Sequence, residues 1–190
     1  MNAIGITRTT EQFPLVERIN ESYVNFYFDH TERTYGEGTQ YSAVMVGVET
    51  QSDDIEEIKA LAIPSIKEYR ISQIADYDKS DNVNTFIIGG NHMWLSVEER
   101  EQIATQISAN EAVGREEMTK WFGGHQFTFP ISQWKQMLVA IEVYAGDALN
   151  VTEGHKAKVN AMRKADNVIE YDFTTGYPEV IDFDNLFANQ

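Results

Sequence analysis

The sequence contains no cysteine, so disulfide bonds and thiolate chemistry are excluded. Basic residues are scarce: 15 lysines and arginines stand against 30 aspartates and glutamates, which gives a net charge of −15. Such a chain repels phosphate backbones and argues against nucleic-acid binding. No apolar run approaches the roughly 20 residues that span a bilayer, and residues 1–10 lack the apolar segment of a secretion signal. We therefore expect neither nucleic acid nor membrane as a partner; the acidic surface provides solubility or docks a basic partner.

Recognisable catalytic motifs are also missing. The sequence has no P-loop, no dinucleotide-binding glycine fingerprint and no Gly-x-Ser-x-Gly elbow. Its four histidines, at positions 30, 92, 125 and 155, lack the paired spacing of a zinc site. Neighbouring acids such as Glu98 and Glu99 point about 100° apart on a helix, which favours solvated faces over a glycosidase pair. We expect no catalytic residues, no cofactor and no metal; an unrecognised enzyme is the least favoured alternative.

What the sequence does have is aromatic residues, with ten Phe, nine Tyr and three Trp in 190 residues. Two segments rich in β-branched and aromatic residues, 23–28 and 41–48, predict a β-hairpin. The polar stretch 29–40 between them predicts a long loop. Ser52, Asp53 and Asp54 then open a helix that extends to about Asp76, with a kink or restart at Pro64.

The polar stretch 77–84 marks a boundary, so we expect a first module over residues 1–78 and a second over 79–190. The second module contains two similar segments. Strands at 86–88 and 93–95 flank Gly89–Gly90, and strands at 120–122 and 127–129 flank Gly123–Gly124, 34 residues further on. Such glycine pairs favour tight hairpin turns, and Ser96 with Glu99 predicts a capping box on the following helix. True duplication and chance similarity of two common hairpins are both open.

A heptad pattern runs through the last helical segment, with apolar positions alternately four and three residues apart. These residues, here called the seam, are Trp134, Leu138, Ile141, Ala145, Ala148, Thr152, His155, Val159 and Met162. The seam either packs on its own domain or joins copies of the chain, and the nearby glycines permit a break near Asn150. In the tail, 168–190, the segments 171–173 and 180–183 are predicted extended, with a turn at 175–178. The tail either wraps its own domain or adds a strand to a partner.

Large aromatic residues gather around the second glycine pair. They form either the domain core or anchors for a partner protein, where Trp and Tyr are favoured. The candidate interaction residues, taken from this cluster, the seam and the tail, are Trp121, Phe122, His125, Phe127, Trp134, Leu138, Ile141 and Tyr177.

Several segments resemble an uncharacterised domain of tailed phages and prophages, common in phages of Bacteroides-type bacteria. They are residues 70–71, 84–95, 119–129, 136–138, 144–145, 155–156 and 171–178, so the resemblance covers about residues 66–180. That family has no catalytic residues to carry over. Its genes tend to lie among tail and tail-fibre genes, so the resemblance implies a virion component or an assembly factor.

Together these features predict an α+β protein: an N-terminal β-hairpin plus helix, then a helix-rich domain with two short β-hairpins and a long C-terminal helix. We expect a virion structural protein, tail- or fibre-associated, that acts through protein–protein contacts. Its expected partners are other phage structural proteins and further copies of itself, and it would be assembled in the host cytoplasm. A tail-fibre assembly chaperone that is absent from the virion is the alternative.

Overall fold

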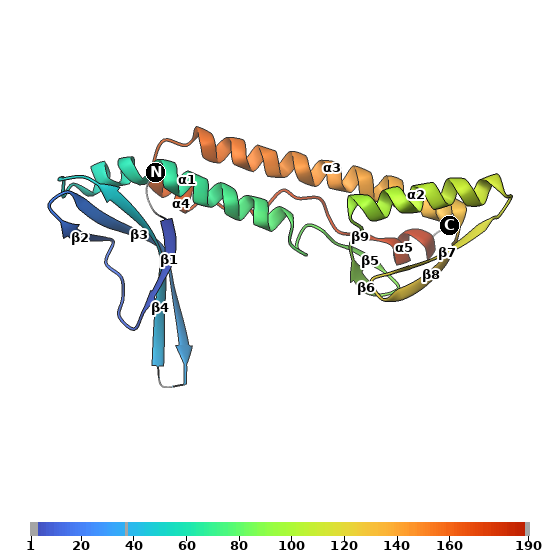
Figure 1. The fold of residues 1–190 in the computed structure, drawn as a ribbon, viewed down its shortest axis with the longest axis horizontal. Coiled ribbons are helices and arrows are strands. Elements are labelled where there is room, and N and C mark those ends of the chain that lie inside the picture. The colour runs from blue at the N-terminus through green and yellow to red at the C-terminus, as the bar shows by residue number, and fades with distance from the viewer. Residues whose placement is uncertain (1–3, 37, 189–190) are drawn as a thin grey trace. The chain divides into compact units, whose positions relative to one another are not determined.

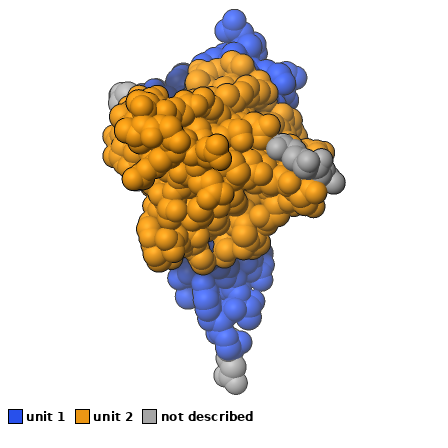
Figure 2. All heavy atoms as spheres, turned by 90° about the vertical axis from the view of Figure 1, so that its right-hand side faces the viewer, with its two compact units in different colours: residues 1–75, 154–173 blue, residues 76–153, 174–190 orange. Residues whose placement is uncertain are grey.

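The computed structural model describes residues 4–36 and 38–188, and it has the α+β composition that the sequence predicts (Figure 1). The chain divides into two compact units, coloured in Figure 2. Unit 1 comprises residues 1–75 and 154–173, and unit 2 comprises residues 76–153 and 174–190. This division differs from the expected one at 78/79, because residues 154–173 cluster with the N-terminal part. Val159, Ala165 and Val168 are buried there among residues of unit 1.

Unit 1 is built on a four-stranded antiparallel sheet in the order β1-β4-β3-β2. Its strands are β1 (Ile4–Thr9), β2 (Val16–Asn20), β3 (Tyr23–Tyr35) and β4 (Gly38–Glu49). The sequence predicts the central hairpin but not the edge strands. Both edge strands are short and almost wholly exposed, so they lack the apolar alternation that marks a half-buried strand.

Helix α1 (Ile55–Asp78) covers one face of this sheet. It begins where predicted, because the Asp54 carboxylate accepts a hydrogen bond from the Glu56 amide at 2.8 Å. The helix continues without interruption through Pro64. Ile58, Ala62, Ile66 and Ile74 are fully buried on its inner face, before and after the proline, and this packing holds the helix together. The short helix α4 (Ala165–Ile169) completes the core of unit 1.

The predicted loop at 29–40 is mostly strand, and this expectation is wrong. β3 runs on to Tyr35 and β4 begins at Gly38, so the connection is short. The ladder shifts register between Phe28 and Thr31, at a bulge, and then resumes. Beyond the bulge the ribbon projects past the helix that covers the sheet (Figure 1). Its side chains are largely exposed, so the segment reads as polar although its backbone is paired.

Unit 2 contains the two predicted hairpin–helix segments. β5 (Phe86–Ile88) and β6 (Asn91–Met93) lead into α2 (Val97–Ala112), which has the predicted capping box. β7 (Glu117–Phe122) and β8 (His125–Pro130) lead into α3 (Ile131–Ala161). The tail is divided between the units: Val168 is buried in the core of unit 1, and residues 174–188 belong to unit 2. There β9 (Ile181–Asp182) pairs in parallel with β5, and α5 (Phe183–Ala188) follows.

The two hairpins contact each other reciprocally through equivalent residues. A Cβ atom on Gly89 would lie 3.3 Å from the Phe127 ring, and one on Gly123 would lie 3.2 Å from the Met93 sulfur. The 34-residue shift relates Gly89 to Gly123 and Met93 to Phe127, so each turn packs against the partner hairpin at the same place. Both glycines have positive φ, 59° and 55°. The hairpins therefore pair about a local pseudo-twofold relation.

Helix α3 is continuous from Ile131 to Ala161, with no break near Asn150. The seam faces the interior of the chain. Trp134 and Ile141 are fully buried in the core of unit 2, and Val159 is fully buried in the core of unit 1. Of the two alternatives, the structure therefore favours a seam that packs on its own chain, because these side chains are already covered.

Candidate functional site

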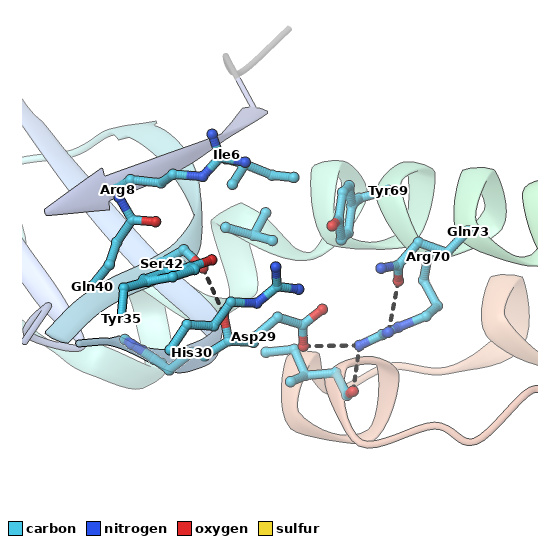
Figure 3. Close-up of a pocket in the computed structure, with 15 residues that line it drawn as sticks. Ile6, Arg8, Asp29, His30, Tyr35, Gln40, Ser42, Tyr69, Arg70 and Gln73 are labelled. Carbon is cyan, nitrogen blue, oxygen red and sulfur yellow. Dashed lines mark hydrogen bonds and ion pairs between the residues drawn. The ribbon is translucent and has the colours of Figure 1, made fainter. Parts of the chain in front are cut away.

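Unit 1 contains a hollow of about 750 Å³, shown in Figure 3. It lies between the inner face of the projecting ribbon and the second half of α1. The strands contribute Ile6, Arg8, Asp29, His30, Thr31, Arg33, Tyr35, Gln40, Ser42, Ala43 and Val44, and the helices contribute Tyr69, Arg70, Gln73 and Ile169. "The hollow" hereafter means this set.

The sheet register determines which side chains enter the hollow. Arg8 pairs with Ser42, which also pairs with Thr31, so these three side chains form a row across β1, β4 and β3. The Thr31 and Ser42 hydroxyls are 2.5 Å apart, which confirms that they share a face. Arg33 lies in the next row on that face, two residues along β3. The intervening Glu32 points to the opposite face of the sheet, because successive side chains of a strand alternate between faces. The Glu32 carboxylate is therefore kept away from Arg33.

One wall of the hollow is fixed by the buried guanidinium of Arg70. It donates hydrogen bonds to the Val168 carbonyl at 3.1 Å, to Gln73 Oε1 at 2.7 Å and to the Ile169 carbonyl. Its Nη2 also donates to Asp29 Oδ1 at 3.2 Å. Arg70 and Asp29 are therefore mutually compensated and have little charge to offer a ligand.

Arg8 and Arg33 are different. Both are exposed, both line the hollow, and in the described ranges 4–36 and 38–188 neither guanidinium has a hydrogen bond or ion pair with protein. Burial, and next the charge of Asp29, raise the pKa of Tyr69, so its hydroxyl stays neutral and can donate a hydrogen bond. The hollow thus combines two uncompensated cations with hydroxyl and amide groups, an arrangement that binds anionic groups.

Most of the sequence-predicted interaction residues lie in the core of unit 2. Phe122, Phe127, Trp134 and Ile141 are buried there, and Leu138 is half-buried against them. The Trp134 indole N–H donates to the Met118 carbonyl at 2.9 Å, so even its polar group is satisfied internally. These side chains are core because each one faces the packed side of its hairpin or helix.

The three remaining candidates differ in exposure. Trp121 is 65% exposed on the outer face of the β7–β8 hairpin, and His125 is exposed at its turn. Tyr177 is half-buried, and its hydroxyl lies 3.0 Å from the Thr152 hydroxyl. Trp121 and His125 are therefore the predicted residues that unit 2 presents to solvent.

The turn at Gly89–Gly90 binds a side chain from the C-terminal part of the same chain. The Asp184 carboxylate accepts hydrogen bonds from the amides of Gly89 at 2.7 Å and Gly90 at 2.8 Å. The turn is therefore occupied by the protein's own tail, which attaches α5 to the hairpin. This role of Asp184 has no sequence signature, because the partners lie about ninety residues apart.

Sequence reasoning missed the hollow because it assigned residues 29–40 to a loop. The local sequence offered no strand signal there, because residues 29–40 lack the apolar–polar alternation that marks a half-buried strand. No group of three or more His, Asp or Glu side chains in the described part of the chain is placed to hold a metal ion. Within the same residues, no helix is both long and apolar enough to cross a membrane.

Comparisons with protein-family models, curated proteins and solved structures gave no match to this chain. Its function is therefore inferred mainly from the geometry of its own surfaces.

Proposed function

We propose that this chain is a structural component of a tailed-phage particle, associated with the tail or its fibres, that works by binding other proteins. The observation that carries the proposal is the outer part of the β3–β4 ribbon. Residues 30–35 of β3 are all exposed, yet they remain paired with β4 as far as Tyr35 and Gly38. This ribbon adds nothing to the core of unit 1.

A two-stranded ribbon is at best marginally stable in water by itself. An ordered ribbon that buries little of its own chain has surface and backbone available for a partner, and contact with a partner would stabilise it. The ribbon is therefore the element that we assign to assembly contacts. The resemblance of residues 66–180 to a phage tail-associated domain supports the same class of function.

Each unit also has exposed apolar residues that are available for contacts. In unit 1, Ile6 is 63% exposed on the edge strand β1 and Ile19 is 50% exposed on the opposite edge strand, β2. In unit 2, Trp121 is the large exposed aromatic residue of the β7–β8 hairpin. Trp is among the residues that most often dominate binding energy at protein interfaces.

Mass spectrometry of purified particles tests the proposal. A structural component is present at a fixed ratio to the other tail proteins through successive purification steps. A chaperone is present in the infected cell and absent from the particle. Absence from the particle would overturn the proposal and favour the assembly chaperone.

A deletion variant tests whether the outer part of the β3–β4 ribbon is needed for incorporation into particles. Residues 30–42 are replaced by Asn-Gly, which forms a tight hairpin turn flanked by Asp29 and Ala43 and keeps the buried Phe28 opposite Val44. We expect the variant to fold, as judged by circular dichroism, and to be excluded from particles. The matched control is Arg163→Ala, an exposed change in the same unit, which should be incorporated normally.

Self-association is the second part of the proposed contacts. Because the seam is covered by its own chain, copies would associate through exposed residues such as Ile6 or Trp121. Sedimentation of the purified chain measures the assembly state. An oligomer that dissociates on Ile6→Glu or Trp121→Glu supports self-association, whereas a monomer at all concentrations restricts the contacts to other proteins.

A further inference from the structure

The hollow and the free edge of β1 lie side by side, because Ile6 and Arg8 belong to both. We infer that an extended acidic segment of a partner protein adds a strand to β1 and places its carboxylates against Arg8 and Arg33. This deepens the proposed function, on which it rests, since it names the chemistry of the protein that is bound.

The backbone of β1 is available for strand addition. All six residues of β1 pair with β4 on one side, from Ile4 opposite Val46 to Thr9 opposite Tyr41. On its other side, β1 ends the sheet in the part of the chain that the structure describes. Unpaired amides and carbonyls along such an edge are a template for an incoming strand, and main-chain hydrogen bonds would supply much of the affinity.

The side chains on the inner face of β1 specify what the incoming strand carries. Ile4, Ile6 and Arg8 share this face, since they pair with Val46, Val44 and Ser42. The two isoleucines are exposed and the arginine follows them. An added strand would bring alternate side chains beside these three residues. The complementary sequence therefore has apolar residues followed by an acidic one on a single face.

Charge selects an acidic rather than a basic segment. Arg8 and Arg33 have no protein partner in the described residues, although the chain has twice as many acidic as basic residues. Asp29 is the acidic residue among those that line the hollow, and its carboxylate is paired with Arg70. Glu32 lies on the other face of its strand. A carboxylate beside Arg8 or Arg33 would meet a guanidinium that has no partner in the described residues and would form charge-assisted hydrogen bonds with it.

The size and walls of the hollow favour a peptide over a small inorganic anion. Its volume of about 750 Å³ exceeds what one anion between two arginines requires. Tyr35 and Tyr69 provide aromatic walls, and Gln40 and Ser42 provide hydrogen-bonding groups around the arginines (Figure 3). A peptide would cover the aromatic walls and the arginines together, whereas phosphate would leave the walls exposed.

The test uses the full chain and a fluorescent peptide of about eight residues, as in a typical strand. Threonine occupies every second position, and valine, valine, glutamate and glutamate occupy the positions between, so that the apolar and acidic side chains share one face. This probe is called the valine–glutamate peptide. Fluorescence anisotropy measures binding. We expect Arg8→Ala and Arg33→Ala each to weaken binding by about tenfold, the loss expected for a charge-assisted contact. Arg163→Ala, the exposed control in the same unit, should change binding by less than about twofold. Neither Arg8 nor Arg33 has a hydrogen-bond or ion-pair partner among the residues that the structure describes, so the variants should keep the wild-type unfolding midpoint.

Two further peptides distinguish the contribution of the glutamate charges to binding from that of main-chain hydrogen bonds with β1. The same peptide with lysine in place of glutamate should not bind. The valine–glutamate peptide with all of its backbone amides methylated should bind at least about tenfold more weakly, because neither of its edges can donate hydrogen bonds to β1. Equal binding of either peptide, or equal loss in the Arg163 variant, would overturn the proposal.

Inorganic phosphate is the last probe. Saturable phosphate binding that needs Arg8 and Arg33, with no peptide binding at any concentration, would assign the hollow to small anions and also overturn the proposal. Neither peptide result depends on particle composition. A chain that binds the peptide but is absent from virions would overturn the proposed function alone, and a virion component that binds no peptide would overturn this inference alone.

Discussion

Arg70 on α1 donates a hydrogen bond from Nη2 to Oδ1 of Asp29, 3.2 Å away, at the bulge in β3. Asp29 has a φ of 50°, the left-handed region that few residues other than glycine adopt. The same guanidinium holds the carbonyls of Val168 and Ile169 at the end of α4. One buried cation thus joins the covering helix, the bulge that begins the projecting ribbon, and the segment 154–173 that returns to unit 1.

Replacing this cation should be costly. We expect Arg70→Met to lower the free energy of unfolding by about 3 kcal/mol, because the Asp29 carboxylate and two carbonyls lose their donor. Urea denaturation measures the change, and Arg163→Met is the matched exposed control. A loss no larger than in the control would mean that water replaces the guanidinium at no cost.

The Asp184 carboxylate should be needed to hold the tail on the first hairpin. Asp184→Ala removes both acceptors from the Gly89 and Gly90 amides, and we expect a loss of about 1 kcal/mol because the site is exposed. The tail should also become more sensitive to limited proteolysis, since α5 loses its attachment. Asp147→Ala, an exposed acid without a side-chain partner in the described residues, serves as control. Equal protease sensitivity of both variants would contradict the assigned role.

Gly47 in β4 makes room for a tyrosine ring. A Cβ atom at this position would lie 1.8 Å from the Tyr23 hydroxyl oxygen and 2.6 Å from Cζ. Gly47→Ala should therefore cost about 2 kcal/mol, the usual range for overpacking, as the ring is displaced. The same change in a Tyr23→Ala background should cost much less, since the obstacle is gone. Additive losses in this double-mutant cycle would show that the ring is not the constraint.

The two tryptophans of the second hairpin–helix segment should behave oppositely. Trp134 is fully buried, so Trp134→Ala is expected to cost about 3–5 kcal/mol. Trp121 is 65% exposed, so Trp121→Ala should leave the unfolding free energy within about 0.5 kcal/mol. If Trp121 anchors a partner, its variant should fold normally and fail in particle incorporation. A large stability loss for Trp121→Ala would instead place it in the core.

Stability should fall at alkaline pH. A hydrogen bond to Asp166 raises the pKa of Lys59, and burial raises the pKa of Tyr27, Tyr69 and Tyr144. Each group binds its proton more tightly when folded, so its contribution is present below the ordinary values of 10.0 for tyrosine and 10.5 for lysine. The contribution is lost as pH rises through the raised values.

Urea unfolding at neutral pH and above pH 10.5 measures this loss. Tyr27→Phe removes one titrating hydroxyl and should make the decline with pH shallower, which separates the effect from general repulsion in an acidic chain. A decline of unchanged steepness in this variant would exclude Tyr27 as a contributor.

Local patterns determined much of the fold. The Ser96–Glu99 capping box, the two glycine-pair turns and the heptad seam of α3 were all predictable, because each depends on residues a few positions apart. The heptad pattern did not predict which residues pack against the seam. Only the packed chain shows that Trp134 and Val159 are buried in two different units.

The candidate site was decided by tertiary structure. Its arginines lie on two strands that do not pair with each other, Arg8 on β1 and Arg33 on β3, and they share a face only because both strands register against β4. Residues 29–40 look like a loop because nothing apolar marks them. Cross-strand pairing with β4, which no local pattern encodes, makes them strand. The sequence by itself therefore determined most helices and hairpins through local patterns. Long-range pairing of β1 and β3 with β4 decided that Arg8 and Arg33 line the same hollow.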